Sequence, residues 1–135
     1  RDAEAEKGKE QFAQFDPPTP YYKEKVYYHD LVTEADGTVK TAIVNENLEG
    51  GKFGVSVTYN QKELPFFTEW KMMGEATYVV GLEPANCRVE GRAKERERGT
   101  LIELEPGEIR EYHVEIGVLE DAKAVDAFLS SMVKV

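Results

Sequence analysis

The chain has 135 residues, and its 17 Lys and Arg against 26 Asp and Glu give a formal net charge of −9 at pH 7. With 41% hydrophobic and 32% charged residues it can bury a core, which excludes a disordered chain. Because so acidic a surface repels phosphate backbones and anionic lipid, we expect neither nucleic acid nor a membrane as a partner. The single cysteine, Cys87, excludes an internal disulfide and favours a cytoplasmic location.

Residues 1–20 predict a helix followed by a proline-rich lead-in. The stretch 2–15 is rich in Ala, Glu, Lys and Gln, which favour a helix. The prolines within 16–20 end that helix and impose an extended path, because proline lacks the N–H that a helix needs.

The region 21–119 predicts β-sheet, since apolar residues alternate along it and turn residues interrupt it. Strands are expected over 25–32, 38–45, 52–60, 66–73, 76–82, 101–104 and 109–119. Asp36 and Gly37 predict a hairpin that joins the first two strands. The nearly all-apolar run 76–82 predicts a central strand, and the charged stretch 90–100 predicts a loop.

The tail 120–135 predicts a C-terminal helix, because its apolar residues recur at helical spacing and Asp121 stands in its first turn. Seven short strands between turn signals predict an all-β fold, either a sandwich or a segment of a barrel. Because no internal repeat or linker divides the chain, we expect residues 1–135 to form a single domain.

The sequence contains none of the usual metal, nucleotide or catalytic-serine motifs, so we expect no metal and no cofactor. Glu83 ends an apolar strand immediately before a proline, where a partly desolvated carboxylate is suited to accept a proton. The alternative is that Glu83 faces water at a strand end. Trp70 is either a platform for a sugar ring or a core residue, and Lys71 either binds hydroxyl groups or pairs with a nearby glutamate.

Four segments taken together resemble the aldose 1-epimerase-like proteins: 70–74, 78–87, 90–92 and 104–108. The resemblance is closest to the branch called DUF4432, within the galactose-mutarotase-like superfamily, and it spans about 17–119. It implies an all-β, antiparallel β-sandwich of the supersandwich type, with short helices at both ends of this chain. Because family proteins are roughly twice as long, it also implies that the chain is the C-terminal half of a larger β-sandwich domain.

In that superfamily a glutamate takes the proton from the C1 hydroxyl of a sugar while a histidine protonates the ring oxygen. The ring opens and recloses as either anomer, with no metal or organic cofactor. The resemblance assigns the general base to Glu83, and it assigns a second carboxylate, which holds sugar hydroxyls, to Glu24 with Asp30 as its rival. The family's histidine lies in the earlier half, so His29 could replace it only if the sheet brought His29 across the sugar from Glu83.

The resemblance therefore implies a carbohydrate-binding isomerase that acts on a monosaccharide or sugar derivative. The expected substrate-binding residues are Glu24, Trp70, Lys71, Asn86 and Arg92. The alternatives are a non-catalytic sugar-binding β-sandwich module and a structural β-domain with a vestigial site. We expect this part of the protein to be inactive alone, and to self-associate or to bind an N-terminal fragment through exposed strand edges.

Two further expectations concern the surroundings of Glu83. The net charge disfavours a phosphorylated sugar, whereas Arg88 and Arg92 favour one. We also expect Cys87 to pack as a small apolar residue beside the site.

Overall fold

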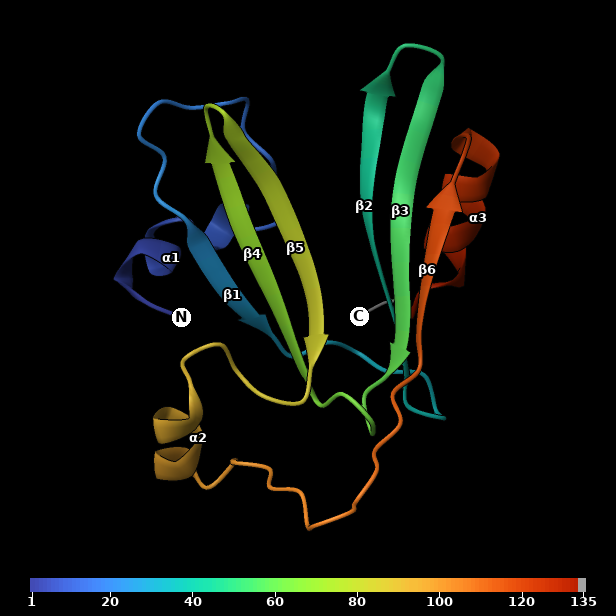
Figure 1. Cartoon of the computed structure of the whole chain (residues 1–135). Helices are drawn as coiled ribbons and strands as arrows, with labels where there is room; N and C mark the ends of the chain where they lie inside the picture. Colours follow the sequence, from blue (N-terminus) through green and yellow to red (C-terminus); the bar gives the residue numbers. More distant parts are fainter. Residues whose placement is uncertain (134–135) are drawn as a thin grey trace. The chain divides into compact units, whose positions relative to one another are not determined.

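The computed structural model describes residues 1–133, which form two three-stranded antiparallel sheets and a few short helices (Figure 1). The chain divides into two compact units. The first comprises Arg1–Asp30 and Phe66–Glu103, and the second comprises Leu31–Pro65 and the chain from Leu104 onward. The prediction of an all-β fold with short helices at both ends is confirmed. No helix within residues 1–133 is long and apolar enough to span a membrane.

The first unit holds one sheet, in the order β1-β4-β5, and three short helical segments. Its elements are α1 (Ala3–Lys7), η1 (Lys9–Gln11), β1 (Lys25–His29), β4 (Phe66–Gly74), β5 (Thr77–Ala85) and α2 (Arg92–Arg98). Asp2 caps α1 by accepting hydrogen bonds from two backbone N–H groups. Because Gly8 follows α1, the predicted helix over 2–15 is broken into two short pieces.

The register of this sheet is unbroken and sorts its side chains onto two faces. Tyr28 pairs with Thr68, which pairs with Glu83, and alternate residues along each strand point to the same side. We call this side the Glu83 face; it carries Val26, Tyr28, Phe66, Thr68, Trp70, Gly81 and Glu83. The opposite side, the Lys71 face, carries Tyr27, His29, Phe67, Glu69, Lys71 and Leu82.

The N-terminal segment packs on the Lys71 face. The ring of Phe12 lies 5.2 Å from the His29 ring and 6.4 Å from the Tyr27 ring, centroid to centroid. The Lys71 ammonium donates hydrogen bonds to the backbone carbonyls of Gln11, at 2.9 Å, and of Gln14. These bonds tie the irregular chain after η1 to the centre of the sheet.

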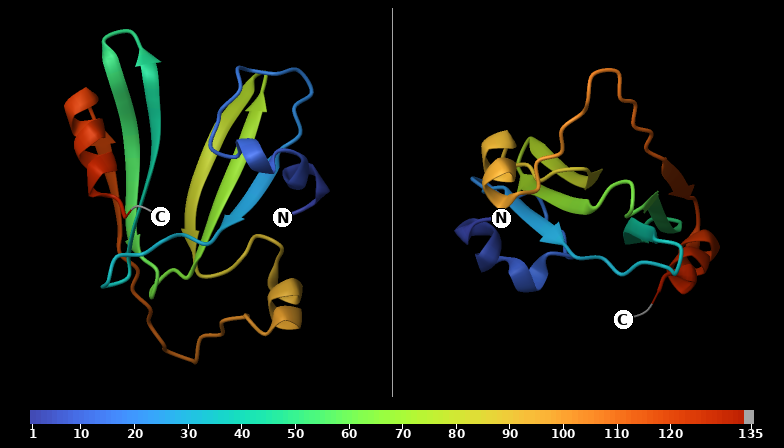
Figure 2. Two further views of the ribbon diagram at one scale, coloured as in Figure 1. Left: turned by 180° about the vertical axis from the view of Figure 1, so that it is seen from behind. Right: turned by 90° about the horizontal axis from the view of Figure 1, so that it is seen from below.

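The second unit holds the sheet β2-β3-β6 and one helix (Figure 2). Its elements are β2 (Thr38–Leu48), β3 (Gly51–Asn60), β6 (Val114–Leu119) and α3 (Ala122–Ser131). The helix packs against β3 and β6, and the ammonium of Lys52 pairs with Asp126 of α3 at 2.8 Å. Small residues allow the close packing on this side of the sheet, since a Cβ on Gly117 would lie 2.6 Å from the Ser56 hydroxyl.

The other face of this sheet is apolar and largely exposed. Its exposed residues are Phe53, Val55, Val114, Ile116 and Val118. The alternation of apolar and small or polar residues along 52–60 thus predicts the strand and its two faces correctly. The helix, however, covers the face of small residues rather than the apolar one. The predicted self-association stays a prediction.

Two predictions about strand pairing are wrong. Asp36 and Gly37 form a turn, with Gly37 at φ +96°. This turn joins no hairpin, because β1 pairs with β4 of its own unit, whereas β2 belongs to the second unit and pairs with β3. The apolar run β5 is an edge of its three-stranded sheet, and β4 is the central strand. Sequence alternation locates strands, but the partner of each strand depends on contacts far along the chain.

Three element assignments also change. The stretch 90–100 contains α2, whose charged residues form pairs one turn apart, such as Lys94 with Glu97 at 2.9 Å, and which ends at Gly99 in a left-handed conformation. Residues 101–104 form no strand, and the predicted strand 109–119 is confined to β6. The C-terminal helix is confirmed, with Asp121 as its N-cap.

The attachment of α3 yields a stability prediction. Val125 is completely buried beneath the helix, so Val125→Ala should lower the free energy of unfolding by about 2 kcal/mol. Val133, which is 46% exposed, supplies the matched control, because Val133→Ala should change the free energy of unfolding by less than about 0.5 kcal/mol. Urea denaturation followed by circular dichroism measures both, and equal effects would contradict this packing.

Candidate functional site

Glu83 lies on β5, half-buried, on the face that the N-terminal segment does not cover. Its carboxylate has no hydrogen-bond or ion-pair partner among residues 1–133. Gly81, two residues earlier on the same face, makes room for it, since a Cβ at position 81 would overlap the Glu83 carboxylate. A carboxylate held open in this way can accept a proton from a ligand.

Thr68 stands directly opposite Glu83 on the central strand. Paired residues of neighbouring strands have Cβ atoms about 5 Å apart, so the two side chains are neighbours. Thr68 is 1% exposed, and its hydroxyl has no hydrogen-bond partner in the described part of the chain. A buried hydroxyl without a partner is uncommon, and this one lies beneath the surface beside Glu83.

Glu24 and Trp70 form the next part of the Glu83 face. The indole N–H of Trp70 donates a hydrogen bond of 2.9 Å to Glu24, and the Arg1 guanidinium donates one of 2.9 Å to the other carboxylate oxygen. These two bonds hold the pKa of the Glu24 carboxyl below its usual value. Since Trp70 pairs with Gly81, the predicted sugar platform and the predicted base lie on one surface.

Tyr28 completes the row that contains Thr68 and Glu83. Its hydroxyl donates a hydrogen bond of 3.2 Å to Glu90, which the Arg98 guanidinium contacts at 2.6 Å. Burial, and then the charge of Glu90, raise the pKa of the Tyr28 phenol, so it stays protonated at neutral pH. The Arg98 guanidinium lowers the pKa of Glu90, so the carboxylate is ionised under the same conditions.

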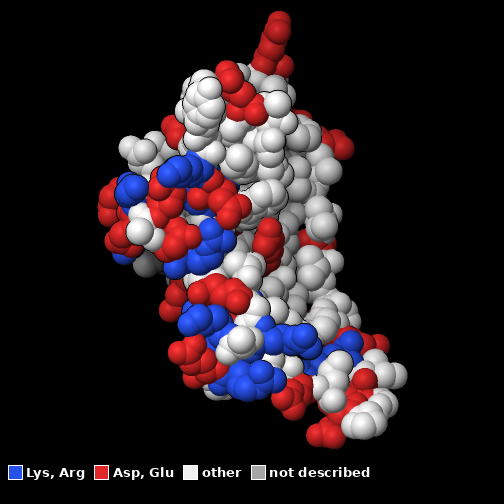
Figure 3. Space-filling model, turned by 60° about the vertical axis from the view of Figure 1, so that its left-hand side comes forward, with Lys and Arg blue, Asp and Glu red and all other residues white. Residues whose placement is uncertain are grey.

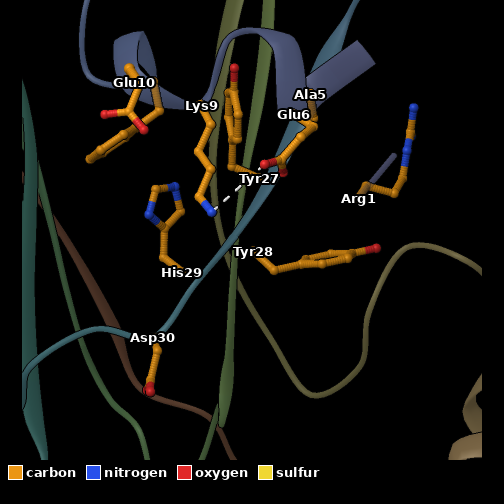
Figure 4. Close-up of a pocket in the computed structure, with 10 residues that line it drawn as sticks. Arg1, Ala5, Glu6, Lys9, Glu10, Tyr27, Tyr28, His29 and Asp30 are labelled. Carbon is orange, nitrogen blue, oxygen red and sulfur yellow. Dashed lines mark ion pairs between the residues drawn. The ribbon is translucent and has the colours of Figure 1, made fainter. Parts of the chain in front are cut away.

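The Lys71 face carries a different cluster beside a cavity of about 500 Å³. Figure 4 shows Tyr27 and His29 extending from β1 toward the N-terminal segment at this cavity. His29 Nε2 lies 3.0 Å from Glu69, whose carboxylate is buried. Burial raises the pKa of Tyr27 to about 12. No group of His, Cys, Asp or Glu within residues 1–133 is arranged to hold a metal ion.

The structure thus brings together some of the predicted site residues and separates others. Glu83, Glu24 and Trp70 share the Glu83 face. Lys71 does not, because it points to the opposite side, where burial lowers the pKa of its ammonium and backbone carbonyls bind it. His29 also lies on the Lys71 face, so the sheet does not bring it across from Glu83.

The remaining predicted residues lie at the margins of the sheet. Asn86 directly follows β5, Arg92 is the exposed first residue of α2, and Asp30 is exposed just after β1. The thiol of Cys87 is exposed, so the expectation that Cys87 packs as a small apolar residue is wrong.

Sequence reasoning missed Thr68, Gly81 and Tyr28 as members of this surface. The spacing of Gly81 and Glu83, two residues apart on one strand, is a signal that could have suggested room for the carboxylate. No signal marks Thr68 or Tyr28, because their nearness to Glu83 depends on the pairing of three strands.

Comparison with known proteins identifies the family. Residues 1–118 match the family described as "Domain of unknown function (DUF4432)". The chain belongs to the DUF4432 family. No curated protein matches it.

A solved structure shares the fold of this DUF4432 chain. It is the crystal structure described as that of a putative aldose 1-epimerase from Klebsiella pneumoniae, with a TM-score of 0.88 and 23% sequence identity. The similarity covers 97% of this chain and 34% of that one, so the chain spans about a third of the length of that protein. The predicted aldose 1-epimerase-like β-sandwich fold is thereby confirmed, although a shared fold does not by itself assign an activity.

The Glu24 contacts predict a pH response. Because the folded-state pKa of Glu24 is lowered, its bonds to Arg1 and Trp70 persist above the usual glutamate pKa of 4.5 and are lost as pH falls through the lower folded value. Trp70 is the only tryptophan in the chain, so its fluorescence should report this protonation with a midpoint below pH 4.5.

Glu24→Gln provides the control, since the amide does not titrate and the transition should vanish. A midpoint at or above pH 4.5, or an unchanged transition in Glu24→Gln, would contradict the assigned contacts.

Proposed function

We propose that this DUF4432 chain forms part of a carbohydrate-binding isomerase of the aldose 1-epimerase type, with Glu83 as its general base. The observation that carries the proposal is the unbroken register β1-β4-β5, which sets an unpaired carboxylate beside Trp70 and Glu24 on one face. An apolar ring plane next to hydrogen-bonding carboxylates is the usual chemistry of a sugar site. The proposed ligand is a monosaccharide or sugar derivative, and the proposed location is the cytoplasm.

The proposed reaction interconverts the two anomers of an aldose. Glu83 accepts the proton of the C1 hydroxyl as the C1–O5 bond breaks, and an acid donates a proton to O5, which gives the open-chain aldehyde. Rotation about the C1–C2 bond and reclosure return the two protons and yield either anomer. Atoms and charges balance without a co-reactant, because the base and the acid exchange roles on the return step.

The acid has no candidate histidine on the Glu83 face among residues 1–133. His29 points to the Lys71 face, and His113 belongs to the second unit, where its ring lies 3.0 Å from Glu63. The solved relative is about three times as long as the matched region. We therefore assign the acid to a residue beyond this chain, and we expect the described residues alone to be inactive.

The absence of a histidine on this face also supports a second candidate, a sugar-binding module without turnover. Trp70, Glu24 and Glu83 would then hold a sugar with no proton transfer. The two proposals differ in what Glu83 does, so one substitution separates them.

Glu83→Gln keeps the shape of the side chain but removes the base. In the complete natural polypeptide that contains this chain, two-dimensional exchange NMR on free aldoses should show anomer exchange that falls at least about 100-fold in this variant, because a positioned base contributes that much. Affinity for the sugar should change much less, since the amide still forms hydrogen bonds.

Glu75→Gln is the matched control: Glu75 is an exposed residue of the β4–β5 turn, and its substitution should leave exchange unchanged. If the unsubstituted protein binds an aldose without accelerating exchange, the binding module is correct. If Glu83→Gln exchanges anomers as fast as the unsubstituted protein, Glu83 is not the base.

A further inference from the structure

A second cavity borders the Glu83 face at the end where α2 and its flanking loops lie. It has a volume of about 540 Å³ and is lined by Arg1, Tyr28, Arg88, Glu90, Arg98 and Thr100. Three of these six side chains are arginines, in a chain whose net charge is −9. On the face that Figure 3 shows, basic and acidic side chains are interspersed rather than separated by sign.

Arg88 is the arginine whose charge is not matched. Its guanidinium lies 4.4 Å from the centroid of the Phe66 ring and 5.9 Å from that of the Tyr28 ring. Both rings belong to the Glu83 face, and cation–π contacts of this kind orient a guanidinium. No described residue accepts a hydrogen bond from Arg88 or forms an ion pair with it, so its five N–H donors face the cavity or solvent.

The other arginines of the cavity are held by carboxylates. Arg98 contacts Glu90 at 2.6 Å and Glu95 at 3.4 Å, and Glu95 is only 2% exposed. Arg1 is paired with Asp2 and Glu24. Each of these two arginines is held by two carboxylates, so Arg88 is the only guanidinium lining the cavity that no described carboxylate pairs with.

The cavity is close enough to Glu83 for one ligand to reach both. Tyr28, which lines the cavity, is two strands away from Glu83 in the same row of the sheet. Neighbouring strands lie about 4.8 Å apart, so the two backbones are about 10 Å apart on one face. Side chains that extend from these two strands on the same face can therefore contact the opposite ends of one sugar.

We propose that the substrate of this site is an aldose with an anionic substituent, bound by Arg88 in the cavity while its anomeric hydroxyl meets Glu83. A guanidinium recognises phosphate, sulfate and carboxylate groups through paired N–H donors. Arg88 is held beside the Phe66 and Tyr28 rings, and no described carboxylate pairs with it. This inference rests on the proposed sugar site, and it adds the class of sugar.

The test compares glucose, glucose 6-phosphate and glucuronate in the complete natural polypeptide by exchange NMR. We expect kcat/KM to be at least about tenfold higher for an anionic aldose than for glucose, since a hydrogen bond to a charged group contributes at least that factor. Arg88→Gln should reduce the ratio of kcat/KM for the anionic aldose to kcat/KM for glucose about tenfold. Arg96→Gln, at an exposed position of α2, is the matched control and should keep the ratio. A ratio near one, or a ratio that Arg88→Gln leaves unchanged, overturns the inference.

A binding measurement separates this inference from the proposed activity. If no aldose shows accelerated anomer exchange, the isomerase proposal fails. The anion-binding inference is then tested alone: the Arg88 Nε–H resonance should still shift and saturate on titration with glucose 6-phosphate or glucuronate. It should not shift with glucose. Inorganic phosphate identifies the source of the anion. If inorganic phosphate binds as tightly as glucose 6-phosphate, the sugar contributes nothing to binding and the inference is overturned. The inference is also overturned if none of the anions shifts the Arg88 resonance.

Discussion

The candidate site depends on the pairing of one central strand, β4, with both β1 and β5 in unbroken register. Side chains on a strand alternate between faces, so a slip of one residue in either pairing would move every side chain of that strand to the other side. With the observed register, Glu83, Thr68 and Trp70 lie on one face of the sheet, with the Thr68 hydroxyl buried. The same register places His29, Glu69 and Lys71 on the other.

The Lys71 face shows how the register is fixed. Lys71 and Glu69 are charged residues that are almost fully buried. The bonds of Lys71 to two carbonyls of the N-terminal segment, and the contact of Glu69 with His29, offset part of the cost of burying them. On the wrong face these groups would lose their partners, which penalises a slipped register. Lys71, a substrate-binding candidate in the sequence, therefore serves to attach the N-terminal segment.

Much of the fold follows from local pattern, and the site follows only in part. The strand over 52–60, the helix begun by Asp121 and the position of Glu83 at a strand end are all readable from residue spacing and capping. The pairing of β1 with β4 is not, because some 40 residues separate the two strands and the turn at Asp36 and Gly37 gives a misleading local signal. The alternation of side chains along one strand also does not say which of its residues share a face with a given residue of a neighbouring strand. For this reason Lys71, adjacent to Trp70 in sequence, looks like a fellow site residue although it points the opposite way.

The most direct test of the account is which face of the β1-β4-β5 sheet a sugar contacts. Isotope-filtered NMR on the complete polypeptide with an aldose bound measures nuclear Overhauser effects between sugar protons and assigned side chains. The account predicts contacts from the sugar to the Trp70 indole and the Tyr28 ring, and none to His29 or Phe12. Contacts to His29 and Phe12, without contacts to Trp70, would place the sugar on the Lys71 face and contradict the central claim.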